Sequence, residues 1–183
     1  MSAKLISIMG APSSGKSTLA TAIHSELKRM GKNSIFISEA ATDFIAEYGV
    51  PESPLDQMVI FYKQLNREKM YLGSKDYVVC DSSSLLNYFY FRSLFPKKLS
   101  NKDIASINHM QKEILKSLSY WTNIYYVNPI LENTEDGIRF HNKEEILKLD
   151  RCIKSYLDIE NIEYTDLSNI KLEDRTKFIL NYL

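Results

Sequence analysis

Cysteine, glycine and proline are scarce in this sequence of 183 residues, which contains two cysteines, six glycines and five prolines. The cysteines, Cys80 and Cys152, show neither metal-ligand spacing nor a disulfide framework, which excludes small domains stabilised in either way. Cys80 ends an apolar stretch and Cys152 lies in a helical pattern, so we expect both side chains to be buried and reduced. The chain also contains no internal repeat, low-complexity tract or linker.

The sequence also lacks a long apolar run and an excess of charge of either sign. No stretch is long and apolar enough to span a bilayer, and the N-terminus has no signal-like pattern, which predicts a cytoplasmic protein. The 23 lysines and arginines balance 23 aspartates and glutamates, which argues against broad electrostatic capture of nucleic acid or of an acidic membrane. This length predicts a single domain, residues 1–183, with a well-buried core.

The strongest signal is one dense motif near the N-terminus. Residues 10–18 read Gly-Ala-Pro-Ser-Ser-Gly-Lys-Ser-Thr and fit the P-loop pattern G-x-x-x-x-G-K-[ST]. The apolar run 5–9 before the motif is typical of a buried strand, and helical spacing follows Lys16. A strand, a loop and a helix in this order direct backbone N–H groups at one point, where they hold a polyphosphate. The alternative, a chance turn rich in glycine and serine, does not explain the flanking strand and helix.

The motif therefore predicts binding of a nucleoside triphosphate. In this pattern the lysine, here Lys16, reaches the β- and γ-phosphates, and the following hydroxyl, here Ser17, binds Mg²⁺. The residues expected to surround the phosphates are Gly10, Ala11, Ser13, Ser14, Gly15, Lys16, Ser17 and Thr18.

Hydrophobic periodicity divides the rest of the chain into alternating strands and helices. This alternation requires crossover connections and therefore a mainly parallel sheet with helices on both faces. We thus expect an α/β P-loop NTPase fold, a three-layer α/β/α arrangement with five mainly parallel strands and a lid segment. The expected strands are 5–9, 34–38, 77–80, 121–127 and 162–167, and the expected helices are 16–30, 42–48, 55–72, 85–95, 101–118, 143–157 and 173–183.

Asp81 directly follows the apolar stretch 77–80. An aspartate that ends a strand beside the P-loop strand is typical of a Walker B carboxylate, which orders Mg²⁺ directly or through water. A carboxylate near this position can instead accept the proton of an attacking hydroxyl. A third interpretation is a helix cap, aided by the serines at 82–84. We expect a functional Asp81, and the sequence does not separate the metal role from the base role.

Two more acids, Glu39 and Asp43, follow the second expected strand within about one helical turn. In one interpretation they face the phosphoryl acceptor and hold sugar hydroxyls or a cationic ring. In the other they are acids near a helix N-terminus that stabilise the helix macrodipole. Tyr88 is near enough to Asp81 to stack on an acceptor ring, although its helix is mainly core-forming.

Arg139 lies in a polar stretch that contains a glycine and precedes a helix, as expected for a lid over about residues 132–151. A guanidinium there would neutralise the equatorial oxygens of the transferring phosphoryl group, which contributes ~10³-fold or more in rate where an arginine finger operates. The expected catalytic residues are therefore Lys16, Asp81 and Arg139, and the expected metal ligands are Ser17 and Asp81.

Short motifs in a shared order carry a family resemblance over most of the chain. They are Gly10–Leu19, Glu39-Ala40-Ala41-Thr42-Asp43-Phe44, Gln64-x-x-x-Glu68, Asp81-Ser82-Ser83 leading to Tyr88, and Asp136-Gly137-Ile138-Arg139. Together they resemble the NadR-type ribosylnicotinamide kinase domains and the wider AAA_28-like group of small P-loop nucleoside and nucleotide kinases.

The resemblance implies a nucleoside-kinase-like fold and Mg-ATP-dependent phosphorylation of a ribose 5′-hydroxyl, as in nicotinamide riboside. Two features depart from similar domains. Ser83 stands where such domains often have a second aspartate, and the arginine often found soon after the strand-two glutamate is absent, with Thr42 and Asp43 in its neighbourhood. The acceptor therefore stays open among nicotinamide riboside, other nucleosides and nucleotides.

The sequence, together with the resemblance, favours a small-molecule kinase that uses ATP and Mg²⁺. The acceptor is expected between the second and third strands, bounded by Glu39, Asp43, Gln64 and Tyr88. Catalysis would consist of positioning and charge neutralisation, with a carboxylate, Asp81 by preference, receiving the hydroxyl proton. The alternative is a P-loop NTPase that acts as a nucleotide-dependent regulatory or binding module without kinase activity. The expected partners are a nucleoside triphosphate and a small-molecule acceptor, without nucleic acid or membrane, and a homo-oligomer is left open.

Overall fold

The computed structural model describes residues 3–94, 100–117, 121–130 and 143–183, and it contains a five-stranded sheet in the order β2-β3-β1-β4-β5. Each of the four pairs of neighbouring strands is parallel. The expected parallel α/β fold is therefore confirmed. The strands are β1 (Lys4–Met9), β2 (Ser34–Ile37), β3 (Tyr77–Asp81), β4 (Trp121–Tyr126) and β5 (Thr165–Asp166).

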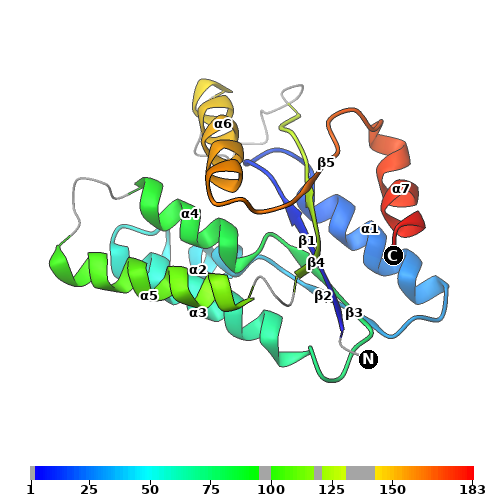
Figure 1. Ribbon diagram of the computed structural model, residues 1–183, viewed down its shortest axis with the longest axis horizontal. Helices are drawn as coiled ribbons and strands as arrows, with labels where there is room; N and C mark the ends of the chain where they lie inside the picture. Colours follow the sequence, from blue (N-terminus) through cyan, green and yellow to red (C-terminus); the bar gives the residue numbers. More distant parts are fainter. Residues whose placement is uncertain (1–2, 95–99, 118–120, 131–142) are drawn as a thin grey trace.

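Helices cover both faces of the sheet and complete three layers, with α1 and α7 on one face and α3, α4, α5 and α6 on the other (Figure 1). The short helix α2 packs against α3. The helices of the described residues are α1 (Lys16–Arg29), α2 (Ala40–Tyr48), α3 (Pro54–Met70), α4 (Ser84–Leu94), α5 (Asn101–Ser117), α6 (Lys143–Ile159) and α7 (Arg175–Asn181), with a 3₁₀ turn at Leu172–Asp174.

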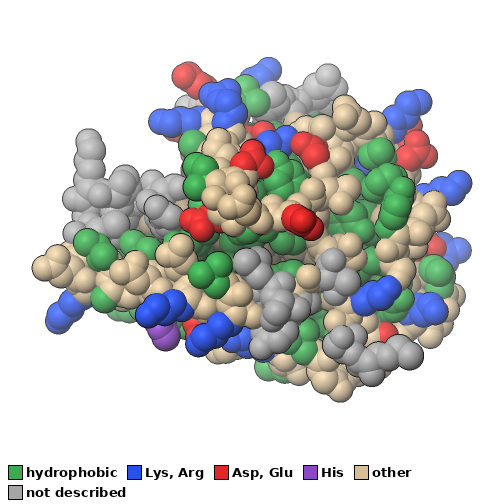
Figure 2. Space-filling model, in the orientation of Figure 1, with side chains coloured by type: hydrophobic (Ala, Val, Ile, Leu, Met, Phe, Trp, Pro, Cys, Tyr) green, Lys and Arg blue, Asp and Glu red, His purple; other side chains and the backbone are tan. Residues whose placement is uncertain are grey.

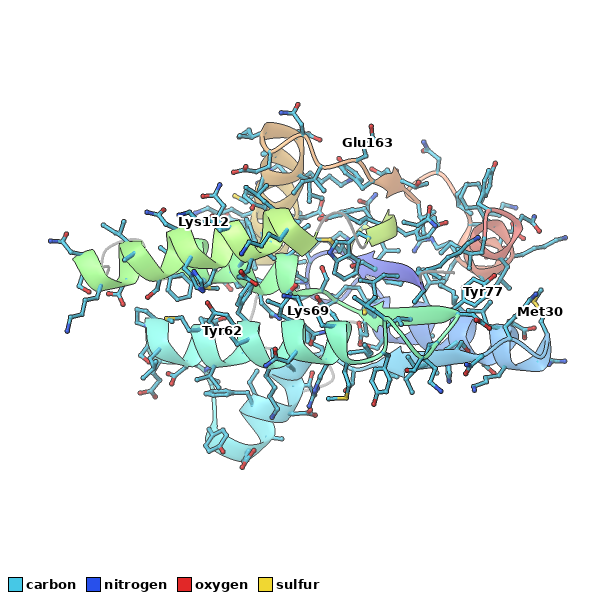
Figure 3. All side chains as sticks on the ribbon, turned by 60° about the horizontal axis from the view of Figure 1, so that its bottom comes forward. Met30, Tyr62, Lys69, Tyr77, Lys112 and Glu163 are labelled. Carbon is cyan, nitrogen blue, oxygen red and sulfur yellow. The ribbon has the colours of Figure 1, made fainter. Side chains whose placement is uncertain are left out.

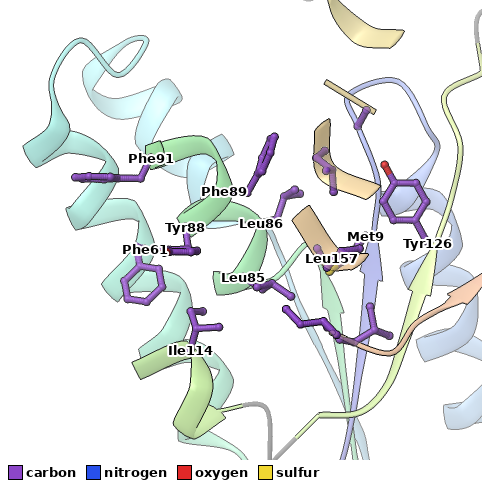
Figure 4. Close-up of a cluster of buried hydrophobic side chains, with 14 of the residues drawn as sticks. Met9, Phe61, Leu85, Leu86, Tyr88, Phe89, Phe91, Ile114, Tyr126 and Leu157 are labelled. Carbon is purple, nitrogen blue, oxygen red and sulfur yellow. The ribbon is translucent and has the colours of Figure 1, made fainter. Parts of the chain in front are cut away.

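The central strand β1 contributes to a core on each side of the sheet. Successive side chains of a strand point to opposite faces, and accordingly Ile6 and Ile8 pack with α1 and α7, whereas Met9 packs with α3, α4, α5 and α6. Figure 4 shows part of the second core, where aromatic side chains of α4 lie between α3 and α6. Burial on both faces explains why β1 is almost continuously apolar.

The expected burial of Cys152 is wrong, whereas Cys80 is buried as expected. The buried side chains of α6 include Ile146, Ile153 and Leu157, which share one face of the helix. Cys152 immediately precedes Ile153 and is therefore rotated by about 100° from it around the helix. This rotation places Cys152 beside the buried face and leaves its side chain exposed.

The expected strand 162–167 is also longer than the observed β5, which pairs with β4 only through Thr165 and Asp166. The backbone N–H of Ile162 instead donates to the carbonyl of Leu157, at 2.9 Å. Because of this hydrogen bond, the first part of the predicted strand belongs to the end of α6 and does not pair with β4. The other predicted helices and strands agree with the described ones to within two residues at each end.

The surface of the described residues carries mixed charge. On the face in Figure 2, lysine and arginine side chains are scattered around the outline without joining into one basic patch among the described residues. Figure 3 shows α5 beside α3, where Nζ of Lys69 lies 3.2 Å from a carboxylate oxygen of Glu113. Within the described part of the chain, no helix combines the length and apolar character needed to cross a membrane.

Candidate functional site

The P-loop joins the carboxyl end of β1 to the start of α1. Two of its residues have left-handed backbone conformations, Ser13 with φ 65° and Gly15 with φ 78°. Backbone of this kind at a helix N-terminus forms a concave nest of N–H groups that binds anions. The hydroxyls of Ser13 and Ser14 are buried there without a hydrogen-bond partner among the described residues. The loop thus presents unsatisfied polar groups where phosphates would bind.

The P-loop rests against the chain that follows β4. The N–H of Val127 donates to the carbonyl of Met9 at 2.8 Å, and the N–H of Ile130 donates to the carbonyl of Ser13 at 2.8 Å. Between these two bonds the chains approach so closely that a Cβ atom on Gly10 would lie 2.2 Å from the Val127 carbonyl oxygen. Gly10 is therefore required by the space available.

Lys16 bends back over the loop, where its Nζ donates to the carbonyl of Ala11 at 3.0 Å. Burial lowers the pKa of Lys16, while the nearby carboxylates of Glu39 and Asp81 counteract this effect and raise it. One ammonium therefore lies in the field of two carboxylates that come from the ends of two different strands.

Asp81 ends β3, and it lies beside Ile8 of the P-loop strand β1, as the sequence predicted for the two strands. The Ser17 side chain lies near its carboxylate. Burial raises the pKa of Asp81, whereas Ser17 and Lys16 hold the pKa down. The Oδ1 atom is buried without a hydrogen-bond partner among the described residues.

The oxygen atoms of Asp81 and Ser17 are suitable ligands for Mg²⁺, which prefers hard oxygen donors and is commonly bound by one or two carboxylates together with substrate phosphates. No group of three His, Cys, Asp or Glu residues within the described ranges is arranged to hold a metal alone. The side chains at this point thus fit a metal that also depends on a bound phosphate.

Glu39 lies between β2 and α2, at the N-cap position of α2, but its side chain makes no capping hydrogen bond within the described residues. Burial raises the pKa of Glu39, Lys16 lowers it, and Asp81 raises it again. The Glu39 carboxylate thus faces the P-loop lysine and the end of β3.

Tyr90 on α4 was not predicted as a site residue, yet it interacts electrostatically with Glu39. Burial raises the pKa of the Tyr90 hydroxyl, and the Glu39 carboxylate raises it further. Helical spacing in the sequence predicts an aromatic helix after Asp81. It does not indicate which ring of that helix interacts with Glu39.

Three of the four expected acceptor-side residues already have partners in the protein. Asp43 pairs with Arg67 at 2.6 Å. The Gln64 side chain is fully buried, and its Oε1 accepts from the N–H of Ala40 at 2.8 Å. Tyr88 is fully buried, and Figure 4 shows its ring directed toward Phe61 of α3. Their roles toward an acceptor stay predictions. Arg139 and residues 132–142 of the expected lid lie outside the described residues, and 143–151 form the first turns of α6.

Glu68 is a further buried acid that the sequence singled out only as part of a motif. Its Oε1 accepts from the N–H of Ser84 and its Oε2 accepts from the Ser84 hydroxyl, both at 2.7 Å. Burial raises the pKa of Glu68 to about 7, although Ser84, Gln64 and Lys69 all lower it.

We expect the Glu68 carboxyl to make the protein less stable as the pH rises from about 4.5 toward 7. In this window the unfolded carboxyl, with an ordinary pKa of 4.5, loses its proton while the folded one keeps it. The total effect is roughly 3 kcal/mol. Urea unfolding at pH 5 and pH 7 measures it. Glu68→Gln should flatten the dependence, whereas Glu163→Gln at an exposed position should retain it, and equal slopes in both variants would contradict the expectation.

Two cavities in the described residues lie away from the P-loop and do not define this site. Their volumes are about 540 and 500 Å³. The first is lined by residues near the start of β4 and before β5, and the second by residues of α4 and α6, with its wall including Phe89, Arg151, Cys152 and Tyr156.

The sequence and the fold are similar to those of known proteins. A model of the AAA_28 family, described as an AAA domain, matches residues 5–175. No curated protein sequence matches the chain. The structure is similar to that of a NadR protein in complex with NR, with a TM-score of 0.73 and 16% sequence identity, over 98% of this chain and 49% of that one. The chain thus spans about half the length of the NadR protein.

The fold is also similar to that of the deoxyadenosine kinase from M. mycoides. The structure of that kinase with dCMP and a flexible dCDP has a TM-score of 0.62 at 10% identity, and the structure with dCTP has 0.65 at 12%, each over 97% of both chains. At these identities the likeness shows the fold alone. It confirms the resemblance to NadR-type domains and the nucleoside-kinase-like P-loop fold expected from the sequence.

Proposed function

This chain belongs to the AAA_28 family of AAA domains, and on that premise we propose that it transfers the γ-phosphoryl group of ATP to a hydroxyl or phosphate of a small nucleoside-type acceptor. One observation carries the proposal. Two carboxylates, Glu39 and Asp81, come from neighbouring strand ends and flank Lys16 of the P-loop. A phosphate site beside a pair of acids has the parts needed for both the donor and the acceptor of a phosphoryl group.

The donor half would consist of the P-loop and the end of β3. The nest at residues 10–15 would hold the β- and γ-phosphates, and Lys16 would exchange its bond to the Ala11 carbonyl for the phosphate oxygens. Ser17 and Asp81 would hold Mg²⁺, which supplies charge neutralisation on the phosphates when bound. The proximity of the two side chains supports this assignment, because both ligands lie at one point.

The acceptor half would contain Glu39, and we assign to this residue the removal of the hydroxyl proton. Asp81 lies near Ser17, the other expected metal ligand, and we assign it to the metal side. The Glu39 side chain caps no helix among the described residues and interacts electrostatically with Tyr90. Its raised pKa also makes it a better base than an exposed glutamate at neutral pH. The sequence favoured Asp81 for this step, and the two assignments are separated by mutation.

The solved structures that share the fold support a nucleoside-type acceptor by analogy, since they contain NR, dCMP, dCDP and dCTP as bound molecules. A ribose hydroxyl reaching Glu39 would lie next to the end of β2, across β3 from the P-loop strand. Nicotinamide riboside, a nucleoside or a nucleotide each satisfies this requirement.

We expect Glu39→Gln to lower kcat by roughly 10²-fold or more, the usual contribution of a general base. The amide keeps the shape of the side chain but cannot take a proton, so the KM for ATP should stay within a few-fold. Steady-state kinetics with each substrate varied in turn would measure both constants. Glu47→Gln, on the exposed side of α2, is the matched control. A Glu39 variant with near-normal kcat would show that this carboxylate is not the base.

The proposal itself is tested by incubating the protein with Mg-ATP and a panel of nucleosides, nucleotides and nicotinamide riboside, with detection of the phosphorylated product. Transfer to at least one acceptor is the expected result. Slow ATP hydrolysis that is indifferent to every acceptor would instead favour the regulatory or binding NTPase that the sequence left as the alternative.

A further inference from the structure

Helix α3 carries two buried polar side chains, Gln64 and Glu68, one helical turn apart. Each is bonded to a backbone N–H in the stretch of chain that follows one of the two site carboxylates. Gln64 accepts from Ala40, the residue after Glu39, and Glu68 accepts from Ser84, three residues after Asp81. Side chains four residues apart lie on the same face of a helix. A single rigid face of α3 therefore touches the chain next to both carboxylates.

Glu68 contacts Ser84 through two hydrogen bonds. Ser84 is the first residue of α4, where backbone N–H groups have no partner within the helix. Both carboxylate oxygens are used, each at 2.7 Å, and the Glu68 side chain is 2% exposed. The N-terminus of α4 is thus tied to the last turn of α3.

The chain between Asp81 and Ser84 needs such a restraint. Ser82 has a left-handed backbone with φ 64°, which is unfavourable for a residue with a side chain. Its N–H donates to the Ile8 carbonyl at 3.1 Å, which fixes the β1 side of the turn. Glu68 holds the other side through Ser84. The strained turn is therefore held at both ends, and it sets where the Asp81 carboxylate points.

We propose that Gln64 and Glu68 are positioning residues, which act through Ala40 and Ser84 to set the separation of Glu39 and Asp81 on either side of Lys16. This inference rests on the phosphoryl-transfer function proposed above. It assigns to the motif Gln64-x-x-x-Glu68 a role in geometry rather than contact with the substrate. It also explains why a carboxylate is buried between α3 and α4, where an apolar side chain would otherwise pack.

The kinetic test compares two substitutions on the same helix. Glu68→Ala removes the bonds to α4 and should lower kcat by at least roughly 10²-fold, because an error of about 1 Å in a catalytic group has this effect. The dissociation constant of Mg-ATP, measured by calorimetry, should change less than about threefold. Leu65→Ala removes buried apolar contacts of α3 without touching those hydrogen bonds, and below its melting temperature it should retain kcat within about threefold.

Glu68→Gln is the conservative variant, because its amide can still accept from the Ser84 N–H and donate to the Ser84 hydroxyl. It should recover at least roughly tenfold of the kcat lost in Glu68→Ala. Equal loss of kcat in Glu68→Ala and Leu65→Ala at matched thermal stability would overturn the proposal, and so would a Glu68→Gln variant no better than Glu68→Ala.

Hydrogen exchange separates a failure of this proposal from a failure of the proposed function. In Glu68→Ala the amides of 82–86 should exchange at least about tenfold faster, with little change in β1 and α1. Leu65→Ala should show no such focus on these amides. If the wild type phosphorylates no acceptor, the function is wrong, and the exchange result alone decides the positioning role. Unchanged exchange of 82–86 in Glu68→Ala would overturn that role whatever the kinase assay shows.

Discussion

Asp81→Asn is expected to lower phosphoryl transfer by on the order of 10³-fold or more while Mg-free ATP binding stays within a few-fold. The carboxylate lies at the end of β3 near the Ser17 side chain, and it has a buried oxygen without a partner among the described residues. Asparagine keeps the size of the side chain but removes the negative charge that Mg²⁺ and Lys16 require. Product formation and calorimetric ATP binding measure the two effects.

Asp76→Asn is the matched control for this prediction, because Asp76 is exposed and lies just before the opposite end of the same strand. It should leave transfer and binding unchanged. A comparison with Glu39→Gln then separates the two carboxylates. Loss of Mg²⁺ dependence in the Asp81 variant only would support the metal role, whereas near-normal turnover of Asp81→Asn would remove the residue from both the metal and the base assignments.

Gly10→Ala is expected to reduce ATP affinity by at least roughly 10²-fold and to destabilise the fold by about 1–3 kcal/mol. A methyl group at this position would lie 2.2 Å from the Val127 carbonyl oxygen, which is backbone and cannot turn aside. The P-loop would have to move away from residues 127–130, and the hydrogen bonds that Met9 and Ser13 accept from Val127 and Ile130 would lengthen. ATP titration and thermal unfolding measure the two effects.

Gly73→Ala provides the matched control, since a methyl group at Gly73 would meet nothing within 4 Å. This variant should bind ATP like the wild type and unfold at a similar temperature. If Gly10→Ala also retained wild-type affinity, the close contact between the P-loop and the chain after β4 would not be required for nucleotide binding.

The fold was predictable because its determinants are local. Apolar runs and helical spacing located each helix and strand of the described residues, and strand–helix alternation requires parallel strands with crossover helices. The place of Asp81 beside the P-loop strand followed from the same rule. The failures also have a local cause. Cys152 lies one residue from the buried stripe of α6, and Ile162 closes that helix before β5 can begin.

The candidate site was predictable only in outline. The P-loop pattern can be recognised from the sequence alone. Glu39 and Asp81 were predicted as site residues because each follows an expected strand. The partners of the expected acceptor residues were not predictable, because Asp43 meets Arg67 and Ala40 meets Gln64 across 24 positions of the sequence. No periodicity encodes such pairs. Glu68 is the clearest case. It follows Gln64 at ordinary helical spacing, and nothing in the sequence indicates that Ser84 packs against it.

The sequence by itself determined the phosphate loop, the order of the elements and the parallel sheet, since these depend on motifs and periodicities within short windows. Only the tertiary structure decided how the pieces act together. The strand order β2-β3-β1 brings Glu39, Asp81 and Lys16 to one edge of the sheet. The packing of α3 against α2 and α4 then determines which polar side chains form hydrogen bonds within the protein and which remain directed at the P-loop.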